Sequence, residues 1–331
     1  MNFIEVKHLI KEFKSAQSSK RGIRDKLLNV QETKRAVDGI DFSIQQGEIV
    51  GYIGPNGAGK STTIKILTGI LVPTSGEVIV NGLVPYKSRK QHASNIGVVF
   101  GQRTQLWWEL PVADSLNLLK HIYKVPDPIF RKNLELYHDI LSIGEFIHKP
   151  VRQLSLGQRM RADFAASLLH NPNILFLDEP TIGLDIVVKE KIRHFIKTIN
   201  EERGVTVILT THDMGDIERL CKRTIVIDKG KKIYDGNVQE MKTHFGKRRI
   251  LVMELSESFK GIEMNGVTLE QEEGLTVTLS FDKELVSPAQ IIAEFMKNYE
   301  IRDLTIQEPQ IQDIVKLIYE GQYSESPMFE K

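Results

Sequence analysis

Residues 54–62 read Gly54-Pro55-Asn56-Gly57-Ala58-Gly59-Lys60-Ser61-Thr62 and fit the pattern G-x-x-x-x-G-K-[ST]. This is the Walker A loop, whose glycines let backbone N–H groups turn inward as a nest for phosphate oxygens. We expect Lys60 to reach the β- and γ-phosphates of a nucleotide and the Ser61 hydroxyl to ligate Mg²⁺. Residues 48–53 predict a buried strand before the loop, and residues 61–67 predict a helix whose N-terminus faces the anion. These flanks favour nucleotide binding by residues 54–62 over a glycine-rich turn that binds nothing.

Two acidic residues mark a second candidate site. The apolar run 173–177 predicts a buried strand, and Asp178 and Glu179 follow at its carboxyl end, where open parallel sheets bind ligands. Asp178 is expected to hold the Mg²⁺ that bridges the β- and γ-phosphates. Glu179 can orient and deprotonate an attacking water as general base. An Asp-Glu pair alone is weak evidence, and it gains weight from the Walker A loop upstream.

The composition narrows the class of protein. The 331 residues carry a formal net charge of +1, which argues against a protein that coats a nucleic acid. The single cysteine, Cys221, excludes an internal disulfide and a CxxC metal site. Residues 1–7 alternate apolar and charged residues, which predicts a strand and not a signal peptide. No run approaches the roughly 20 apolar residues that span a bilayer, so a membrane role is expected to depend on a partner.

Strands that alternate with helices predict an α/β fold of the P-loop NTPase type with a doubly wound parallel sheet. Further strands are expected at 3–13, 36–44, 78–80, 96–100, 205–210, 224–228 and 231–234, and helices at 88–93 and 187–203. Helical apolar spacing from 106 to 169 predicts an inserted helical subdomain at about 104–169. This nucleotide-binding domain is expected to cover residues 1–240. Residues 14–35 are polar and basic and predict an exposed insertion, with a solvated loop favoured over contact with lipid headgroups or a partner.

The pattern changes near residue 246, and residues 246–331 predict a small α+β domain. Its expected strands are 249–255, 275–281 and 301–305, and its expected helices are 288–299 and 309–319. The tail after Gly321 is expected to be loose.

Residues 154–158 read Leu154-Ser155-Leu156-Gly157-Gln158 and precede a predicted helix. Alone, this segment is typical of a helix N-cap. Placed shortly before Asp178, it resembles the signature motif of the ATP-binding-cassette (ABC) ATPases. The resemblance extends over roughly residues 3–240 and includes several motifs in the family's order.

The resemblance implies roles for further residues. Phe13 stands where the family places an aromatic that stacks on adenine. Gln102, separated from its strand by an extra Gly101, stands at the Q-loop, which couples Mg²⁺ and water to the helical subdomain. Asp185, in Gly183-Leu184-Asp185, stands at the D-loop that meets the opposite subunit. His212 stands as the switch histidine that contacts the γ-phosphate.

In this family the signature of one subunit completes the ATP site of the other. Ser155, Gly157, Gln158 and Asp185 are thus expected to face the nucleotide of a second copy, most simply in a homodimer. The implied cofactors are ATP and Mg²⁺, with two ATP molecules sandwiched between two cassettes. Hydrolysis would release the two cassettes from each other.

A closer resemblance involves residues 99–111, which read Val99-Phe100-Gly101-Gln102-Arg103-Thr104-Gln105-Leu106-Trp107-Trp108-Glu109-Leu110-Pro111. This stretch is similar to the daunorubicin/viologen-exporter-like ATPases of ABC-2 type exporters, as is Asp303–Pro309 with the apolar helix after it. The resemblance implies an ATPase subunit at the cytoplasmic side of the cell membrane, bound to separate ABC-2 type permease subunits. Trp107 and Trp108 would lie where such proteins receive the membrane subunit, and packing within the helical subdomain is an equal alternative.

Three alternatives stay open. An importer ATPase is one, although the small α+β tail favours export. A cytosolic cassette ATPase that acts on a macromolecular machine is another, disfavoured by a single Walker A loop and no heptad run. The C-terminal domain could also sense a ligand, contact a second subunit or regulate the ATPase.

Overall fold

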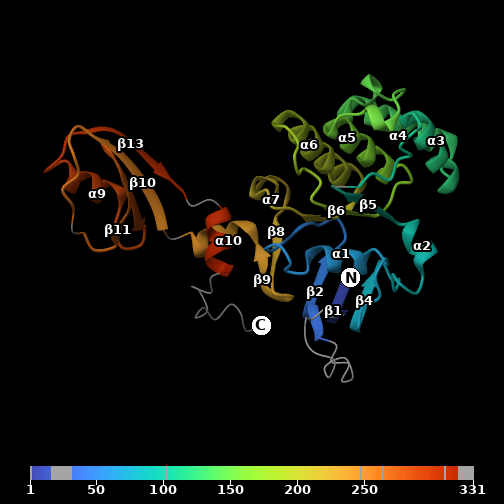
Figure 1. Cartoon of the computed structure of the whole chain (residues 1–331), viewed down its shortest axis with the longest axis horizontal. Helices are drawn as coiled ribbons and strands as arrows, with labels where there is room; N and C mark the ends of the chain where they lie inside the picture. The colour runs from blue at the N-terminus through green and yellow to red at the C-terminus, as the bar shows by residue number, and fades with distance from the viewer. Residues whose placement is uncertain are drawn as a thin grey trace, which may run out of the picture. The chain divides into compact units, whose positions relative to one another are not determined.

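The computed structural model describes residues 2–15, 32–101, 103–246, 248–262, 264–308 and 311–319 (Figure 1). The chain divides into two compact units, Met1–Asp235 and Gly236–Lys331. Most of the predicted basic insertion, the Q-loop residue Gln102 and the tail after Gly321 lie outside the described residues.

The first unit is built on a six-stranded sheet with the order β5-β6-β7-β3-β8-β9. The pairs β5–β6, β6–β7, β7–β3 and β3–β8 are parallel, which confirms the predicted parallel sheet. Helices cover the sheet, so inner strands such as β6 and β7 are largely apolar, whereas the edge strand β9 is mostly polar. The strands are β3 (Ile49–Ile53), β5 (Ile96–Phe100), β6 (Ile174–Asp178), β7 (Thr206–Thr210), β8 (Arg223–Asp228) and β9 (Lys231–Asn237).

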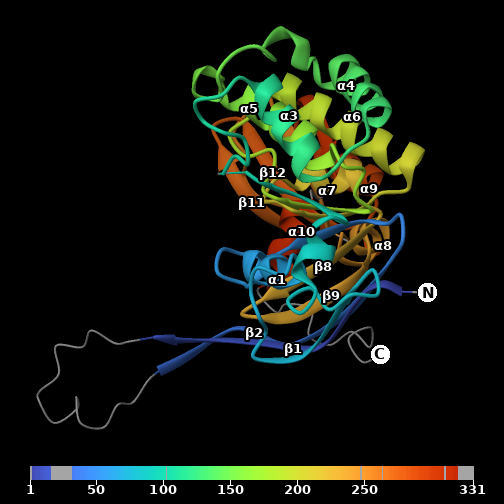
Figure 2. The ribbon, with the colours of Figure 1, turned by 90° about the vertical axis from the view of Figure 1, so that its right-hand side faces the viewer.

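A separate antiparallel sheet has the order β2-β1-β4. Its strands are β1 (Asn2–Ser15), β2 (Glu32–Gln45) and β4 (Ser75–Val80). The sequence predicted these strands but not that they form a sheet of their own. Helix α1 (Lys60–Leu67) lies between this sheet and the central one (Figure 2). Their buried apolar side chains form one core, which fixes the helix that follows the Walker A loop.

The chain between β5 and β6 is helical, as the apolar spacing predicted. It contains α3 (Val112–Ile122), α4 (Asp127–Leu141), the 3₁₀ turns η1 (Ile143–Glu145) and η2 (Val151–Gln153), and α5 (Leu156–Leu168). Pro111, Pro126 and Pro150 are the N-caps of α3, α4 and η2, so the prolines that interrupt the pattern mark where helices begin. The other helices are α2 (Arg89–Ala93), α6 (Ile186–Arg203) and α7 (Met214–Leu220).

The second unit has a four-stranded sheet of order β11-β12-β10-β13 with its own apolar core. Its elements are α8 (Val238–Phe245), β10 (Arg248–Leu255), β11 (Val267–Glu273), β12 (Thr276–Asp282), α9 (Pro288–Phe295), β13 (Ile301–Gln307) and α10 (Ile311–Tyr319). Strand β11 was not predicted. It is an edge strand that pairs with β12 and is exposed from Thr268 to Glu273. Its apolar residues, Val267 and Leu269, alternate over too short a stretch to mark a strand.

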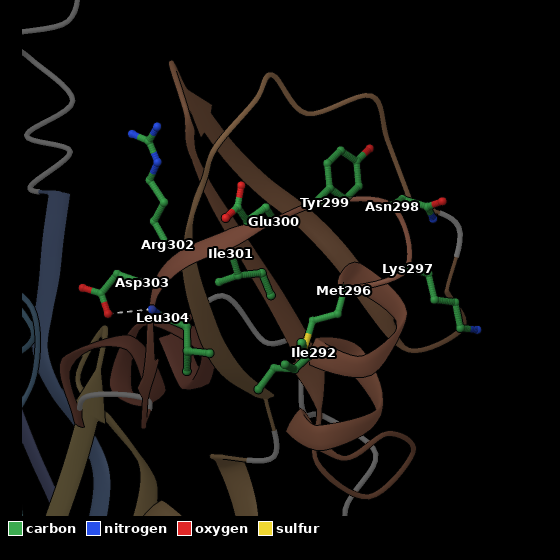
Figure 3. A pocket seen from close by; sticks show the side chains of 10 residues that line it. All are labelled: Ile292, Met296, Lys297, Asn298, Tyr299, Glu300, Ile301, Arg302, Asp303 and Leu304. Carbon is green, nitrogen blue, oxygen red and sulfur yellow. Dashed lines mark hydrogen bonds between the residues drawn. The ribbon is translucent and has the colours of Figure 1, made fainter.

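A cavity of about 700 Å³ lies between α9 and β13 in this unit. Figure 3 shows the apolar side chains of Ile292, Met296 and Leu304 along it. Met296 is 67% exposed, so the cavity is open to solvent.

Every helix in the described part of the chain is too short or too polar to cross a lipid bilayer.

Candidate active site

The parallel register brings the ends of three strands to one edge of the central sheet. Phe100 pairs with Asp178, and Asp178 pairs with Thr210. Strand β3, which precedes the Walker A loop, lies next to β7 in the same direction. The loops that carry residues 54–62, Glu179 and His212 therefore open side by side, as expected of a ligand site in a parallel sheet.

Two glycines of the Walker A loop have no room for a side chain. A Cβ at Gly54 would lie 2.4 Å from the Ile227 carbonyl oxygen, and one at Gly59 would lie 2.3 Å from that of Ala36. Gly59 also has a φ of +110°, in the region that favours glycine. Gly57 differs, because its φ is +83° and a Cβ would meet open space. The loop is thus pressed against β8 and β2 and keeps an open side where a phosphate could approach.

Lys60 lies at this loop and is 5% exposed. Its Nζ donates to the Gly54 carbonyl at 2.6 Å and to that of Pro55 at 3.2 Å. Burial lowers the pKa of Lys60, while the negative charges of Glu179 and Asp178 oppose that shift. Helix α1 has no side-chain cap and no acidic residue in its first turn, so an anion is the natural partner for its N–H groups.

The Asp178 carboxylate fits a magnesium site. Its Oδ1 accepts a hydrogen bond from the Thr210 hydroxyl at 2.6 Å and one from the Ser61 hydroxyl at 3.3 Å. A carboxylate beside a hydroxyl supplies the oxygen ligands that Mg²⁺ prefers, and Mg²⁺ usually takes its other ligands from water and phosphate. Sequence reasoning missed Thr210, because a hydroxyl at a strand end becomes informative only when the strand order is known.

Glu179 and His212 form a direct pair. His212 Nε2 lies 2.6 Å from Glu179 Oε1. Glu179 has a φ of +55°, a strained conformation for a residue with a side chain. Its N–H donates to the Thr210 carbonyl at 2.9 Å, so β7 fixes this conformation.

The extra Gly101 has a structural reason. Its N–H donates to the Asp178 carbonyl at 2.8 Å, and a Cβ at this position would lie 2.1 Å from the Glu179 carbonyl oxygen. Only glycine allows the end of β5 to approach Glu179 this closely. Gln102 lies outside the described residues.

Comparison with known proteins gives the family. The family model described as "ABC transporter" matches residues 37–182. An uncharacterized ABC transporter ATP-binding protein of Methanocaldococcus jannaschii is 30% identical over 83% of this chain and 94% of its own length. The chain is an ABC transporter ATP-binding protein. It is therefore an ATPase with the fold that its motifs predicted.

Two further relatives have functional names. The linearmycin resistance ATP-binding protein LnrL of Bacillus subtilis is 30% identical over 84% of this chain and 92% of its own length. The methionine import ATP-binding protein MetN 2 of Enterococcus faecalis is 30% identical over 93% of this chain and 87% of its own length. Among solved structures, a dimeric ATP-binding cassette bound to ADP and Pi in a post-hydrolysis state has a TM-score of 0.61. It is 28% identical and covers 71% of this chain and 98% of its own.

The predicted signature residues of this cassette lie at the start of α5. Ser155 is the N-cap and accepts from the Gln158 N–H, while the Gln158 side chain accepts from the Ser155 N–H. A Cβ at Gly157 would lie 3.1 Å from the Val188 side chain, so α5 begins against the first turn of α6. Asp185 is the N-cap of α6 and accepts from the Val188 N–H.

Exposed apolar side chains surround these helix starts. Leu156, Ile182, Ile186 and Val187 all belong to the exposed large apolar residues, and Ile186 is 78% exposed. Such a group of apolar side chains beside two capped helix N-termini is typical of an interaction surface.

The aromatic residues singled out in the sequence are also exposed. Phe13 is 42% exposed and pairs across the strands with Lys34, two residues from the Ala36 that contacts the Walker A loop. Trp107 is 40% and Trp108 49% exposed. Neither tryptophan is fully buried, and the Trp108 ring also contacts the helical subdomain, where the Arg159 guanidinium of α5 lies 5.8 Å from its centroid.

Asp163 connects the segment after residue 102 to the signature helix. Its Oδ1 accepts from the Thr104 hydroxyl at 2.8 Å and from the Gln105 N–H at 3.1 Å. Burial raises the pKa of Asp163 to about 6, partly offset by these two hydrogen bonds.

Proposed function

We propose that this cassette is the ATP-hydrolysing subunit of an ABC-2 type exporter. It would bind separate permease subunits at the cytoplasmic side of the cell membrane. The observation that carries this proposal is the exposed pair Trp107 and Trp108, in the stretch that resembles ABC-2 type ATPases. The relative named for linearmycin resistance supports it over most of the chain.

The phosphates would be held by residues 54–62. Lys60 would release its hydrogen bonds to the Gly54 and Pro55 carbonyls and bind the β- and γ-phosphates instead. Ser61 and Asp178 would hold Mg²⁺, with Gln102 as a further proposed ligand. The ion would neutralise phosphate charge and fix the orientation of the triphosphate.

Glu179 would act as general base. Its carboxylate would accept a proton from the attacking water as the water oxygen bonds to the γ-phosphorus and the bond to the β,γ-bridging oxygen breaks. ADP and phosphate would result. His212, 2.6 Å from Glu179, would orient that carboxylate and contact the γ-phosphate.

A second copy would complete each site. Phe13 would stack on adenine, while Ser155, Gly157, Gln158 and Asp185 of the opposite copy would face the phosphates. The solved dimer of a related cassette with ADP and Pi supports this arrangement, as do the exposed apolar residues beside α5 and α6. ATP would thus join the copies and hydrolysis would release them.

Import is a second candidate, favoured by one observation. The relative named for methionine import is similar over 93% of this chain, a length that includes much of the second unit. Transport direction in vesicles that contain the purified complex separates the candidates. Export predicts ATP-driven movement away from the cassette side.

Recovery of the tagged full chain from detergent-solubilised membranes tests the exporter proposal. We expect a polytopic ABC-2 type permease to co-purify with it. Trp107→Ala and Trp108→Ala should lower that recovery severalfold, whereas Leu285→Ala, which alters an exposed apolar residue of the second unit, should not. A chain recovered without any permease, or one that binds it equally in all variants, would contradict the proposed docking.

A further inference from the structure

Asp216 is a fully buried carboxylate that the functions above do not use. It lies on α7 and is 0% exposed. Its Oδ2 accepts from the Thr181 hydroxyl at 2.5 Å and from the Thr211 hydroxyl at 3.3 Å. Its Oδ1 lies 2.6 Å from Arg193 Nε and 2.5 Å from Arg193 Nη2.

These partners come from three different segments. Thr181 lies two residues after Glu179, and Thr211 immediately precedes His212. Arg193 belongs to α6, which begins after its N-cap Asp185. One carboxylate therefore joins the loop of the proposed base, the loop of the switch histidine and the helix of the D-loop.

A second set of contacts fixes the residue after His212. Asp213 donates its N–H to the Thr211 hydroxyl at 2.9 Å, and its carboxylate lies 2.6 Å from Lys189 Nζ and 3.6 Å from Arg193 Nη2. Both Lys189 and Arg193 are on α6. The residues on each side of His212 are thus connected to α6, Asp213 directly and Thr211 through Asp216.

Burial of an ion pair is a poor way to gain stability, because the desolvation of both charges opposes their attraction. A buried ion pair can instead serve to fix one conformation of the chain over the alternatives. Here the arrangement they fix is the relative position of two loops whose side chains, Glu179 and His212, meet at 2.6 Å.

We propose that Asp216 and Arg193 are positioning residues for the hydrolytic step. They hold the Glu179 and His212 loops in register and connect that register to the helix that begins after Asp185. The inference rests on the roles proposed for Glu179 and His212. The Lys60 ammonium bonds to the Gly54 and Pro55 carbonyls, away from this cluster, so we expect loss of the cluster to lower turnover more than ATP affinity.

A substitution at Thr181 tests the proposal most directly. Thr181 is 2% exposed, and valine has nearly the same shape but lacks the hydroxyl that donates to Asp216. In the full chain, Thr181→Val should lower kcat for ATP about tenfold and leave ATP affinity within about twofold of wild type. Thr181→Ser restores the hydroxyl and should return kcat to within about twofold. Equal kcat in the two variants, or a loss of ATP affinity that matches the loss of kcat, would overturn the proposal.

Asp216→Asn tests the carboxylate itself. It should lower kcat at least as much as Thr181→Val, again without loss of ATP affinity. Arg219→Gln is the control, because Arg219 connects the same two helices through Glu190 and is exposed, and its kcat should be unchanged. If Asp216→Asn does not fold, the Thr181 pair decides.

Glu179→Gln, measured in parallel, tests the general-base role of Glu179 separately from the positioning role of Asp216. If it retains turnover, the proposed role of Glu179 is wrong. If it loses turnover while Thr181→Val keeps wild-type kcat, only the positioning role of Asp216 is wrong.

Discussion

Single residues at the site depend on backbone contacts that no motif describes. Glu179 keeps a φ of +55° because β7 holds its N–H and Gly101 leaves room for its carbonyl. The Walker A residues, Asp178 and Glu179 could be predicted from sequence, since the Walker A spacing is local and the two acids follow an apolar strand. His212 was predicted only through the family resemblance. Thr210, Thr181 and Asp216 could not, because their partners become neighbours only through strand order and helix packing.

Glu179→Gln should sharply lower turnover and keep ATP binding. Glutamine preserves size and hydrogen bonding but cannot accept the water proton, so phosphate release should fall about 10²-fold or more. Nucleotide affinity, measured by equilibrium binding, should stay near wild type. Lys60→Ala is the matched contrast and should lose affinity itself. Wild-type turnover in Glu179→Gln would remove this residue from the mechanism.

Asp163→Asn should change how stability depends on pH. The folded-state pKa, about 6, lies above the ordinary 3.8, so this group's stabilisation is complete below about pH 4 and is lost as pH rises through 6. Asparagine keeps the acceptor for Thr104 and Gln105 and carries no charge. The difference in unfolding free energy, variant minus wild type, should therefore increase from pH 5 to pH 8 by up to about 1.4 kcal/mol. Equal differences at both pH values would contradict the raised pKa.

Among the strands and helices, a strand could be predicted from the sequence when both of its faces are buried. The inner strands β6 and β7 are apolar except at their ends and were predicted from sequence, whereas β11 is mostly polar and exposed and was not predicted. Helix starts were better marked, because prolines and capping residues act locally.

Two helices carry the same cap, and this allows a controlled test. Ser155 and Gln158 cap α5 as Ser287 and Gln290 cap α9, each by a capping box. Ser155→Ala and Ser287→Ala should each cost about 1 kcal/mol of stability in thermal unfolding. Of the two variants, only Ser155→Ala should also lower ATPase activity, because α5 is proposed to face a nucleotide and α9 is not. Equal activity in both variants would limit Ser155 to capping.

At the scale of the whole molecule, each unit has an apolar core of its own. Residues 1–237, which keep β9 intact, should therefore fold and bind ATP without the rest of the chain. Circular dichroism and nucleotide binding check this. Aggregation of this fragment at concentrations where the full chain stays monodisperse would show that the first unit depends on the second.

The central claim is that ATP joins two copies of the chain, with the Walker A loop of one copy and the Ser155 corner of the other on the same nucleotide. Light scattering of the Glu179→Gln variant with ATP and Mg²⁺ measures this most directly. We predict the mass of two chains with two bound ATP molecules, and the mass of one chain when Ser155→Arg is added. A Glu179→Gln chain that is saturated with ATP and keeps the mass of a single chain would contradict the account.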